Sequence, residues 1–205
     1  FPGSINIHHE HFIQYCLDIT RSLAYHGFKK IIIVNGHGSN HNLVDTVGRR
    51  TIVETDASCS FCSWWQLLKV DPDFDKQWRE SVFPGGCSHA GELETSMLMH
   101  LAPDSVRTDR IKSEIARTNK RGSKYLWTDL FAKGAIGLVE WTSQYSDSGV
   151  MGEAETATAE KGRICFEEAS RNLAGWIEEY YHMKIEARTG HQSREPSFPL
   201  SFPTD

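Results

Sequence analysis

The stretch that decides the fold is Lys29-Lys30-Ile31-Ile32-Ile33-Val34-Asn35-Gly36-His37-Gly38-Ser39-Asn40. Its four consecutive β-branched residues, 31–34, predict a strand buried on both faces, as in parallel sheets. Two glycines then end the strand in a tight turn, and Ser39 or Asn40 is expected to cap a following helix. His37 therefore falls at the carboxyl end of a central strand, where open α/β sheets bind ligands. A structural histidine in a turn is the alternative, but the flanking glycines clear space around the imidazole and favour a functional role.

The composition predicts a folded domain of moderate negative charge. At 205 residues, 39% of them hydrophobic and 24% charged, the chain is long enough for one domain with a sizeable core. The net charge of −5 and the pI near 6.1 argue against nucleic acid as a partner. No apolar run reaches the roughly 20 residues that cross a bilayer, so we expect no membrane association. No G-x-S-x-G, Walker loop or G-x-G-x-x-G occurs, which argues against a serine hydrolase or a nucleotide-binding enzyme.

The five cysteines are an odd number spread over predicted strands and helices, which favours reduced thiols and a cytoplasmic location. Cys59 and Cys62 form one C-x-x-C, but it lies in an apolar run and has no second pair to complete a zinc site. A structural role is favoured for them. The segment 8–11, His-His-Glu-His, is interpreted as a hydrated helix start rather than a metal cluster, because adjacent residues on a helix point to different faces.

Around the opening stretch, apolar spacing predicts helices and strands in alternation. A helix is expected from Phe12 to near Gly27, then the strand 29–34, a second helix, and a strand over 57–64. This order is the crossover pattern of a parallel sheet. The second helix is expected to bury Leu43, Val44, Val47, Ile52 and Val53 and to leave Arg49 and Arg50 solvated.

A second informative stretch is His89-Ala90-Gly91-Glu92-Leu93-Glu94-Thr95-Ser96. Apolar residues at 93, 97, 98 and 101 predict that it runs into a helix, with His89 and Glu94 near its start. The small residues at 90 and 91 are expected to leave room beside them. First-turn acids favour the helix dipole, which is a sufficient account of Glu92 but a weaker one of Glu94, next to the apolar Leu93.

The remainder of the chain is less regular. Residues 103–149 are expected to form irregular structure with a short helix near 124–132 and to act as a flexible cover. After a turn at 149–153, a long helix is expected to bury Ile164, Cys165, Ala169, Leu173, Ile177 and Tyr181. The proline-containing tail 188–205 has little apolar content, so we expect it to lie on another subunit. Core packing is favoured over substrate contact for Trp64, Trp65, Trp127 and Trp141.

Four ordered motifs resemble one family. The loop 35–40 is similar to the N-G-H-G-x-N loop of the creatininase (creatinine amidohydrolase) family, and 89–96 is similar to its H-A-G-x-x-E-T-S motif. The opening residues 1–5 resemble its F-P-G-T-I segment. Residues 149–153 and 157–162 match G-V-x-G-(D/E) and A-T-A-E-K-G. The chain is thereby identified as a member of this family, and not as creatininase itself.

The resemblance implies an α/β sandwich with a central, mostly parallel sheet flanked by helices, formed by one domain over 1–187 with the tail 188–205. It also implies a homo-oligomer, often a hexamer, and a centre of two divalent metals, which are zinc, manganese or iron in the family. His37 is then a metal ligand, His89 a catalytic acid/base, and Glu94 a ligand or brace of the metal site. We take Glu92 as a second catalytic candidate. The expected reaction is hydrolysis of a C–N bond of a small cyclic amide or related molecule by metal-activated water.

The chain departs from the family pattern at three places. The upstream E-x-H-G motif and a following bridging aspartate are absent, so a separate N-terminal fragment or a partner chain is expected to supply those ligands. Gly38 and Ser39 stand where creatininases carry Tyr and a metal-binding Glu, and Gly85 and Gly86 stand near the position of a substrate-gating Trp. Creatinine is therefore not the expected substrate. The alternative is a non-catalytic subunit that supports an oligomer.

Overall fold

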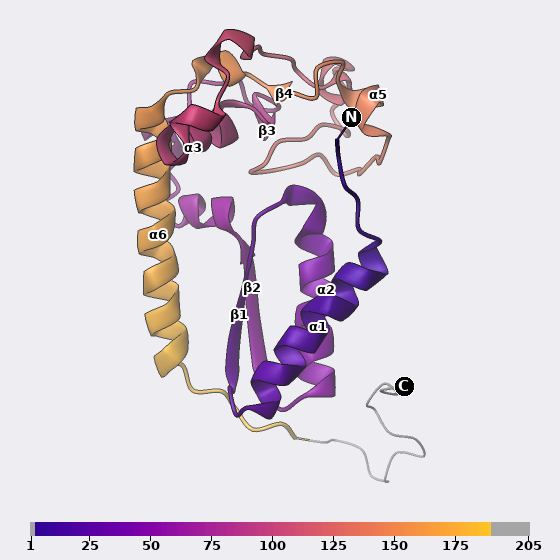
Figure 1. Ribbon diagram of the computed structural model, residues 1–205, viewed down its shortest axis with the longest axis vertical. Helices are drawn as coiled ribbons and strands as arrows, with labels where there is room; N and C mark the ends of the chain where they lie inside the picture. Colours follow the sequence, from indigo (N-terminus) through magenta and orange to yellow (C-terminus); the bar gives the residue numbers. More distant parts are fainter. Residues whose placement is uncertain (1–2, 190–205) are drawn as a thin grey trace. The chain divides into compact units, whose positions relative to one another are not determined.

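The computed structural model describes residues 3–189, which divide into two compact units (Figure 1). Among the described residues, the β1–β2 unit comprises Ile5–Trp64 and 174–189, and the β3–β4 unit comprises Trp65–Leu173 and 3–4. Helices around parallel strands give the mixed α/β fold that was predicted. One domain over 1–187 stays a prediction, and the tail beyond residue 189 lies outside the described residues.

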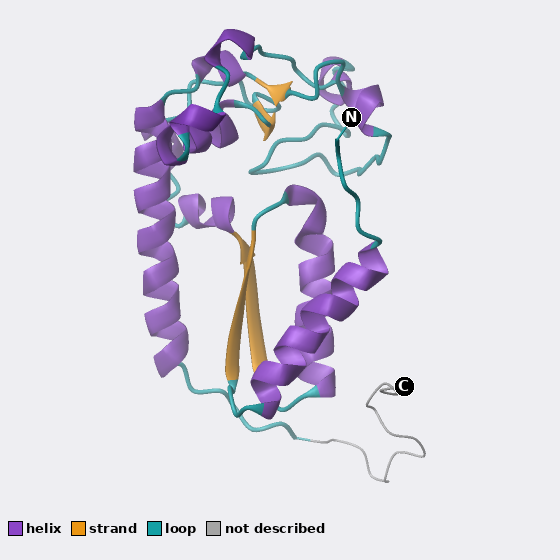
Figure 2. Ribbon diagram, viewed as in Figure 1, coloured by secondary structure: helices purple, strands orange, loops and turns teal. Residues whose placement is uncertain are grey.

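The β1–β2 unit follows the predicted alternation. β1 (Lys30–Asn35) and β2 (Ser58–Ser63) are parallel, and α2 (His41–Glu54) is the crossover between them. α1 (His9–Tyr25) packs against α2, which also packs on β2 (Figure 2). The buried apolar residues of these elements are Leu17, Ala24, Ile31, Val44, Val47 and Ala57. Apolar spacing therefore located both helices and both strands.

The buried face of α2 matches the prediction in part, because Val44 and Val47 are buried as expected. Ile52 and Val53 are 42% and 47% exposed, whereas Thr51 is fully buried. Residues 44, 47, 48 and 51 follow the i, i+3, i+4, i+7 spacing of one helix face, and positions 52 and 53 turn away from it. Thr51 tolerates burial because its hydroxyl is hydrogen-bonded to the Val47 carbonyl and to the Thr20 hydroxyl, both at 2.8 Å.

Burial of β1 on both faces is also only partly observed. Ile31 and Asn35 are buried, but Val34 is 46% exposed. Within the described residues β1 pairs with β2 alone, so its other edge carries no strand there. Of the two arginines expected in solvent, Arg49 is exposed, whereas Arg50 is half-buried and ion-paired to Glu54 at 2.8 Å.

The β3–β4 unit is built around a short antiparallel pair. Its elements are β3 (Cys87–His89), α3 (Glu92–Leu101), α4 (Arg117–Lys120), α5 (Thr142–Tyr145), β4 (Met151–Gly152) and the first part of α6 (Ala159–His182). His89 lies on β3, and only the residues after Gly91 are helical, so the predicted helix begins three residues beyond the histidine. On α3, Leu93 is buried, whereas Leu98 and Leu101 are exposed.

The helix predicted near 124–132 is wrong. Figure 2 shows the chain between α4 and α5 as loop, and its backbone hydrogen bonds are those of a hairpin. The N–H groups of Asp129, Gly134 and Ile136 donate to the carbonyls of residues 132, 127 and 125, at 2.9, 2.9 and 3.0 Å. A β-carbon at Gly134 would lie 2.3 Å from the Tyr125 carbonyl oxygen, so the close approach of the two hairpin arms requires glycine there.

The long helix α6 forms as predicted, with different buried positions. Cys165 and Ala169 are buried, but Ile177 and Tyr181 are exposed and Tyr180 is buried in place of Tyr181. The Tyr180 hydroxyl is hydrogen-bonded to Ser58 of β2 at 2.6 Å. This bond favours burial of the helix face that carries Tyr180 over the face that carries Tyr181. Among the tryptophans, Trp65 is buried as expected, whereas Trp141 is exposed and was wrongly expected in the core.

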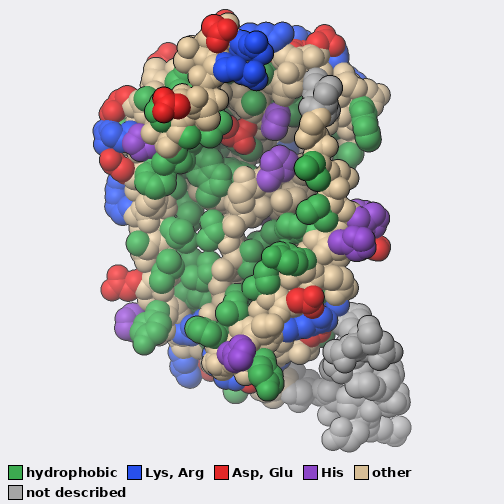
Figure 3. Space-filling model, viewed as in Figure 1, with side chains coloured by type: hydrophobic (Ala, Val, Ile, Leu, Met, Phe, Trp, Pro, Cys, Tyr) green, Lys and Arg blue, Asp and Glu red, His purple; other side chains and the backbone are tan. Residues whose placement is uncertain are grey.

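The histidine-rich segment at the start of α1 is solvent-exposed, as predicted. Figure 3 shows histidine side chains gathered at this helix end, and the rings of His8 and His9 stack at 4.6 Å. Within residues 3–189 the cysteines are free thiols, two of them buried. No helix in that range is long and apolar enough to cross a membrane.

Two glycines of α6 give a matched test of the packing. A β-carbon at Gly162 would lie 2.0 Å from the Ser96 carbonyl oxygen of α3, whereas one at Gly175 would meet nothing within 4 Å. We expect Gly162→Ala to lower the free energy of unfolding by about 1–3 kcal/mol because the two helices must separate. Gly175→Ala should raise it by up to about 1 kcal/mol through helix propensity. Urea unfolding measures both, and equal stability of the two variants would contradict the close helix approach.

Candidate functional site

The loop that carries His37 is held by the last residue of β1. The buried Asn35 side chain accepts a hydrogen bond from the His37 N–H at 3.2 Å and donates to the His37 carbonyl at 2.8 Å. It also donates to the Ser63 hydroxyl at the end of β2, at 2.8 Å. The His41 ring nitrogen Nδ1 lies 2.9 Å from the same hydroxyl. The carboxyl ends of both strands are thus joined by one polar network.

Sequence reasoning missed two members of this network. Ser63 and His41 belong to no recognised sequence motif. The parallel pairing of β1 with β2 places Asn35 directly opposite Ser63, and this strand register is the signal from which Ser63 could have been found. The predicted cap is also different. The Asn40 side chain makes no capping hydrogen bond, and His37 Nδ1 instead accepts one from the Ser39 N–H at 3.3 Å.

The surroundings of His37 are open, as the sequence predicted. A β-carbon at Gly36 or at Gly38 would meet nothing within 4 Å. The contact with Ser39 occupies the lone pair of Nδ1, so a metal ion bound at that nitrogen would have to replace it. This contact is long for a hydrogen bond and is correspondingly weak.

The turn that follows His89 brings the second pair of predicted residues together. A Glu94 carboxylate oxygen accepts a hydrogen bond from the Ala90 N–H at 2.5 Å and lies 4.0 Å from His89 Nδ1. Both side chains are partly exposed, at 41% for His89 and 30% for Glu94. Glu94 therefore binds the backbone just before α3 and faces His89, and its role at a metal site stays a prediction.

The small residues of this turn are required by close backbone contacts. Ala90 has a positive φ of 47°, which is unusual for a residue with a β-carbon. A β-carbon at Gly91 would lie 2.8 Å from the Gly86 carbonyl oxygen, and one at Gly152 would lie 2.5 Å from the same atom. The expectation that Gly91 leaves open room is wrong, because backbone of the neighbouring loop and of β4 fills that space.

Glu92 is the most buried acidic side chain of the turn. Its fully buried carboxylate accepts hydrogen bonds from the backbone N–H groups of Glu80 and Ser81, at 3.0 and 2.9 Å, and from the Lys161 ammonium at 2.6 Å. Burial alone would raise the pKa of Glu92, but the hydrogen bonds from Lys161, Ser81 and Glu80 hold that pKa below its usual range. Its contacts join α3, the loop before β3 and α6, and its catalytic role stays a prediction.

A second buried carboxylate, Asp129, was missed by sequence reasoning. It accepts two hydrogen bonds from Arg79, at 2.6 and 3.1 Å, and one from the Gly85 N–H at 2.8 Å. Arg79 also donates to the carbonyls of Ser81 and Val82. The hairpin and the loop before His89 are therefore fixed to each other. In the sequence, Asp129 is a single acidic residue in a segment of weak periodicity. No residue spacing distinguishes such an Asp from one in a solvated turn.

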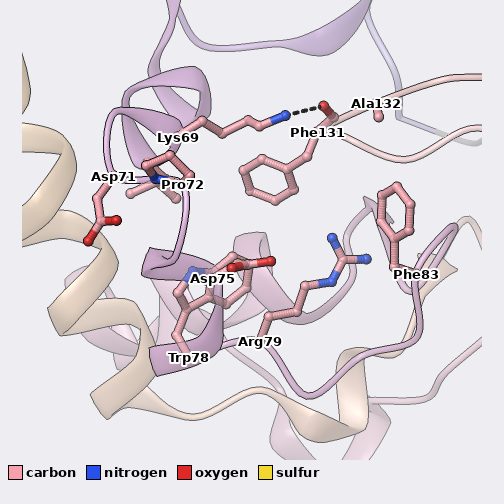
Figure 4. A pocket seen from close by; sticks show the side chains of 10 residues that line it. Lys69, Asp71, Pro72, Asp75, Trp78, Arg79, Phe83, Phe131 and Ala132 are labelled. Carbon is pink, nitrogen blue, oxygen red and sulfur yellow. Dashed lines mark hydrogen bonds between the residues drawn. The ribbon is translucent and has the colours of Figure 1, made fainter.

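Arg79 also borders a surface cavity of about 260 Å³. Figure 4 shows its guanidinium close to Phe131 and Phe83, with the ring centres 5.8 and 5.2 Å away. The Lys69 ammonium donates to the Phe131 carbonyl at 3.0 Å. The cations of this cavity are thus already engaged by carbonyls, rings or Asp129.

The predicted site residues fall in both units. His37 belongs to the β1–β2 unit, whereas His89, Glu92 and Glu94 belong to the β3–β4 unit. Of these, the described contacts bring His89 and Glu94 together. In residues 3–189 no group of three or more His, Cys, Asp or Glu side chains is arranged to hold a metal ion. Imidazole and carboxylate suit zinc or manganese in kind, but these residues do not make up a complete ligand set.

The partly exposed His89 and the Glu94 carboxylate thus share one strand-to-helix turn within an α/β fold. The chain belongs to the creatininase family, because the family described as creatinine amidohydrolase matches residues 1–177. This result confirms the resemblance seen in the motifs.

Individual relatives agree with the family. The mycofactocin precursor peptide peptidase of Mycobacterium tuberculosis is 31% identical over 182 residues, covering 86% of this chain and 60% of the relative. The creatinine amidohydrolase of Pseudomonas putida is 25% identical, covering 88% of this chain and 67% of the relative. Solved structures of a mutant creatininase of Zn-Zn type and of a manganese creatininase align with a TM-score of 0.68 at 25% identity, covering 89% of this chain and 68% of theirs. The chain thus spans about 60% of the length of the peptidase relative.

The buried pair of Glu92 and Lys161 gives a test of how the turn is held. Removing one charge of a buried pair costs about 3–5 kcal/mol, because the other charge stays buried. We expect Glu92→Gln and Lys161→Met each to approach this loss, and the double variant to lose less than the sum of the two. Urea unfolding of the four proteins measures the coupling. The exposed pair of Lys184 and Glu186 is the control, and Glu186→Gln should change stability by less than about 0.5 kcal/mol.

The same pair should make stability depend on pH. Because the folded-state pKa of Glu92 is lowered, its contribution is complete above the unfolded pKa of about 4.3 and is lost as pH falls through the folded value. Glu92→Gln should therefore weaken the acid-induced loss of stability below about pH 4. An unchanged acid profile, or additive losses in the four-protein cycle, would show that the pair does not hold the turn.

Proposed function

We propose that this chain forms part of a metal-dependent hydrolase that cleaves an amide-type C–N bond. The observation that carries the proposal is the pairing of His89 with Glu94, 4.0 Å apart, on the turn that matches the family motif. In this proposal His89 is the proton donor and acceptor, and Glu94 holds the metal site and orients the imidazole.

The chemistry of the chain's own residues supports this assignment. An imidazole can both accept and donate a proton, so His89 is suited to give a proton to a departing nitrogen. Its partial exposure leaves it within reach of a substrate. Glu94 and His37 are the proposed metal ligands. A divalent metal, when bound, supplies a water of lowered pKa and polarises the substrate carbonyl.

The remaining ligands belong to the proposal as well. Two ligands are too few for a stable zinc or manganese site, which takes three or more protein groups. We propose that residues outside this 205-residue sequence, in an N-terminal fragment or a partner chain, complete a centre of one or two divalent metals. A cytoplasmic homo-oligomer, such as a hexamer, is the assembly in which we place it.

The substrate class is also proposed. A small cyclic amide is the sequence-based expectation, and the relatives named above include both an amidohydrolase of creatinine and a peptidase of a precursor peptide. Gly38 and Ser39 replace groups that the creatininase resemblance requires, so we propose an amide other than creatinine. No contact among the described residues favours the non-catalytic alternative. The tests below include the result that would support it.

The metal ligands are tested by metal content. With zinc or manganese supplied to the assembled protein, we expect His37→Ala to lower metal content and turnover together. Glu94→Gln should weaken metal binding first, because an amide is a neutral and poorer ligand than a carboxylate. His26→Ala, at the exposed end of α1, is the matched control. Metal occupancy unchanged in both variants would remove His37 and Glu94 from the metal site.

The role of His89 is tested by separating rate from metal binding. We expect His89→Gln to keep the metal content of the parent and to lose roughly two to four orders of magnitude in turnover, the usual contribution of a general acid/base. Mass spectrometry of metals and steady-state kinetics on amide substrates give the two readouts. Near-normal turnover of the variant would refute the assignment. A parent protein that binds metal but hydrolyses no amide would favour the non-catalytic alternative.

A further inference from the structure

A cavity lined by Met151 of β4 adjoins the strand pair that carries the proposed catalytic histidine. Met151 lines this cavity, whose volume is about 260 Å³, and Met151 is the residue opposite His89 in the antiparallel pair. Residues opposite each other across two strands have β-carbons about 5 Å apart. The register changes between Cys87 and His89, and such bulges re-aim side chains next to sites. The cavity and His89 are therefore linked through Met151, which lines the one and pairs with the other.

The walls of the cavity are mainly apolar. Its lining includes Leu126, Trp127, Ile136, Leu138 and Met151. These side chains come from the hairpin after α4 and from β4, which hydrogen bonds hold in place. The N–H of Gly134 donates to the Trp127 carbonyl at 2.9 Å, so the hairpin walls are fixed independently of any ligand.

The polar groups of the lining are largely engaged within the protein. The Tyr145 hydroxyl donates to the Leu138 carbonyl at 3.0 Å and accepts from the Glu140 N–H at 2.6 Å. The Thr128 N–H donates to the Asn119 side chain at 3.1 Å. The Thr118 hydroxyl is the exception, because it is buried and has no hydrogen-bond partner among the described residues. Lys133 is the one charged side chain of the lining, and it is exposed. A polar group placed inside would therefore lose its hydration with little replacement, whereas an apolar group would gain from burial.

We propose that this cavity receives an apolar group of the substrate, about the size of one amino-acid side chain, next to the bond that is hydrolysed. The inference rests on the proposed function for the position of that bond. It names the substrate class as an amide carrying a bulky apolar substituent. Creatinine, which has a single methyl group, would leave the cavity nearly unfilled.

The binding test uses methionine methyl groups as probes. The chain has four methionines, so selective ¹³C-methyl labelling of the full protein gives few signals, of which Met151 lies in the cavity. We expect N-acetyl-phenylalaninamide to shift the Met151 methyl signal and N-acetyl-glycinamide to leave it in place. Met183, in the other unit, is the internal control.

Wall variants localise the binding. Ile136 and Leu138 line the cavity and are exposed enough for truncation to be tolerated, whereas the neighbouring Val139 is 95% exposed and lies outside the lining. We expect Ile136→Ala and Leu138→Ala to weaken binding of N-acetyl-phenylalaninamide several-fold and Val139→Ala to have no effect. Equal shifts of the Met151 signal with both amides would overturn the proposal. A Met151 signal that moves with protein concentration and not with added amide would also overturn it. The second result would identify the cavity as a contact between copies.

Kinetics separate this inference from the proposed function. With metal supplied, we expect kcat/KM for the phenylalaninamide to exceed that for the glycinamide by roughly tenfold or more, as apolar pockets discriminate. Hydrolysis of both amides at equal kcat/KM would overturn the cavity assignment and leave the hydrolase intact. If neither amide is hydrolysed, the proposed function fails, and the Met151 shift alone decides whether the cavity takes apolar groups.

Discussion

The β3–β4 unit depends on a buried carboxylate that has no access to water. Glu92 receives hydrogen bonds from two consecutive backbone N–H groups, at residues 80 and 81, and from the Lys161 ammonium. A buried charge is tolerated only when its partners replace water, so these three segments must meet in one geometry. Lys161 in turn donates to the Thr156 carbonyl at 2.6 Å, which extends the constraint to the chain before α6.

This constraint fixes the turn on which we place the proposed chemistry. Glu92 lies between His89, three residues earlier, and Glu94, two residues later. Because Glu92 is held rigidly, it sets the separation of the His89 imidazole and the Glu94 carboxylate. Asp129 acts on the other side, because it holds Gly85 and Arg79 and thereby the loop that leads into β3. Three buried or half-buried acidic side chains thus have different tasks. All three accept hydrogen bonds from backbone N–H groups, and Glu94 also faces a partly exposed imidazole.

Backbone contacts complete the site where side chains would not fit. Gly91 and Gly152 approach the Gly86 carbonyl so closely that a β-carbon at either would clash with it. This packing lets β4 lie against β3 and brings Met151 opposite His89. Met151, which lines the apolar cavity, and His89, which faces Glu94, therefore lie opposite each other on the same short strand pair.

The sequence by itself determined the elements and the motifs of this protein. Four β-branched residues and the apolar spacing around them located α1, β1, α2 and β2, because periodicity is a local property of the chain. The motifs around His37 and His89 identified the family for the same reason. The tertiary structure alone decided which faces are buried, as at Thr51 and Tyr180, since a hydroxyl becomes tolerable in a core only when a distant residue bonds it. It also decided that residues 124–132 form a hairpin held by Arg79, and that Glu92 is a buried brace, because both depend on partners about 50 and 70 residues away in sequence.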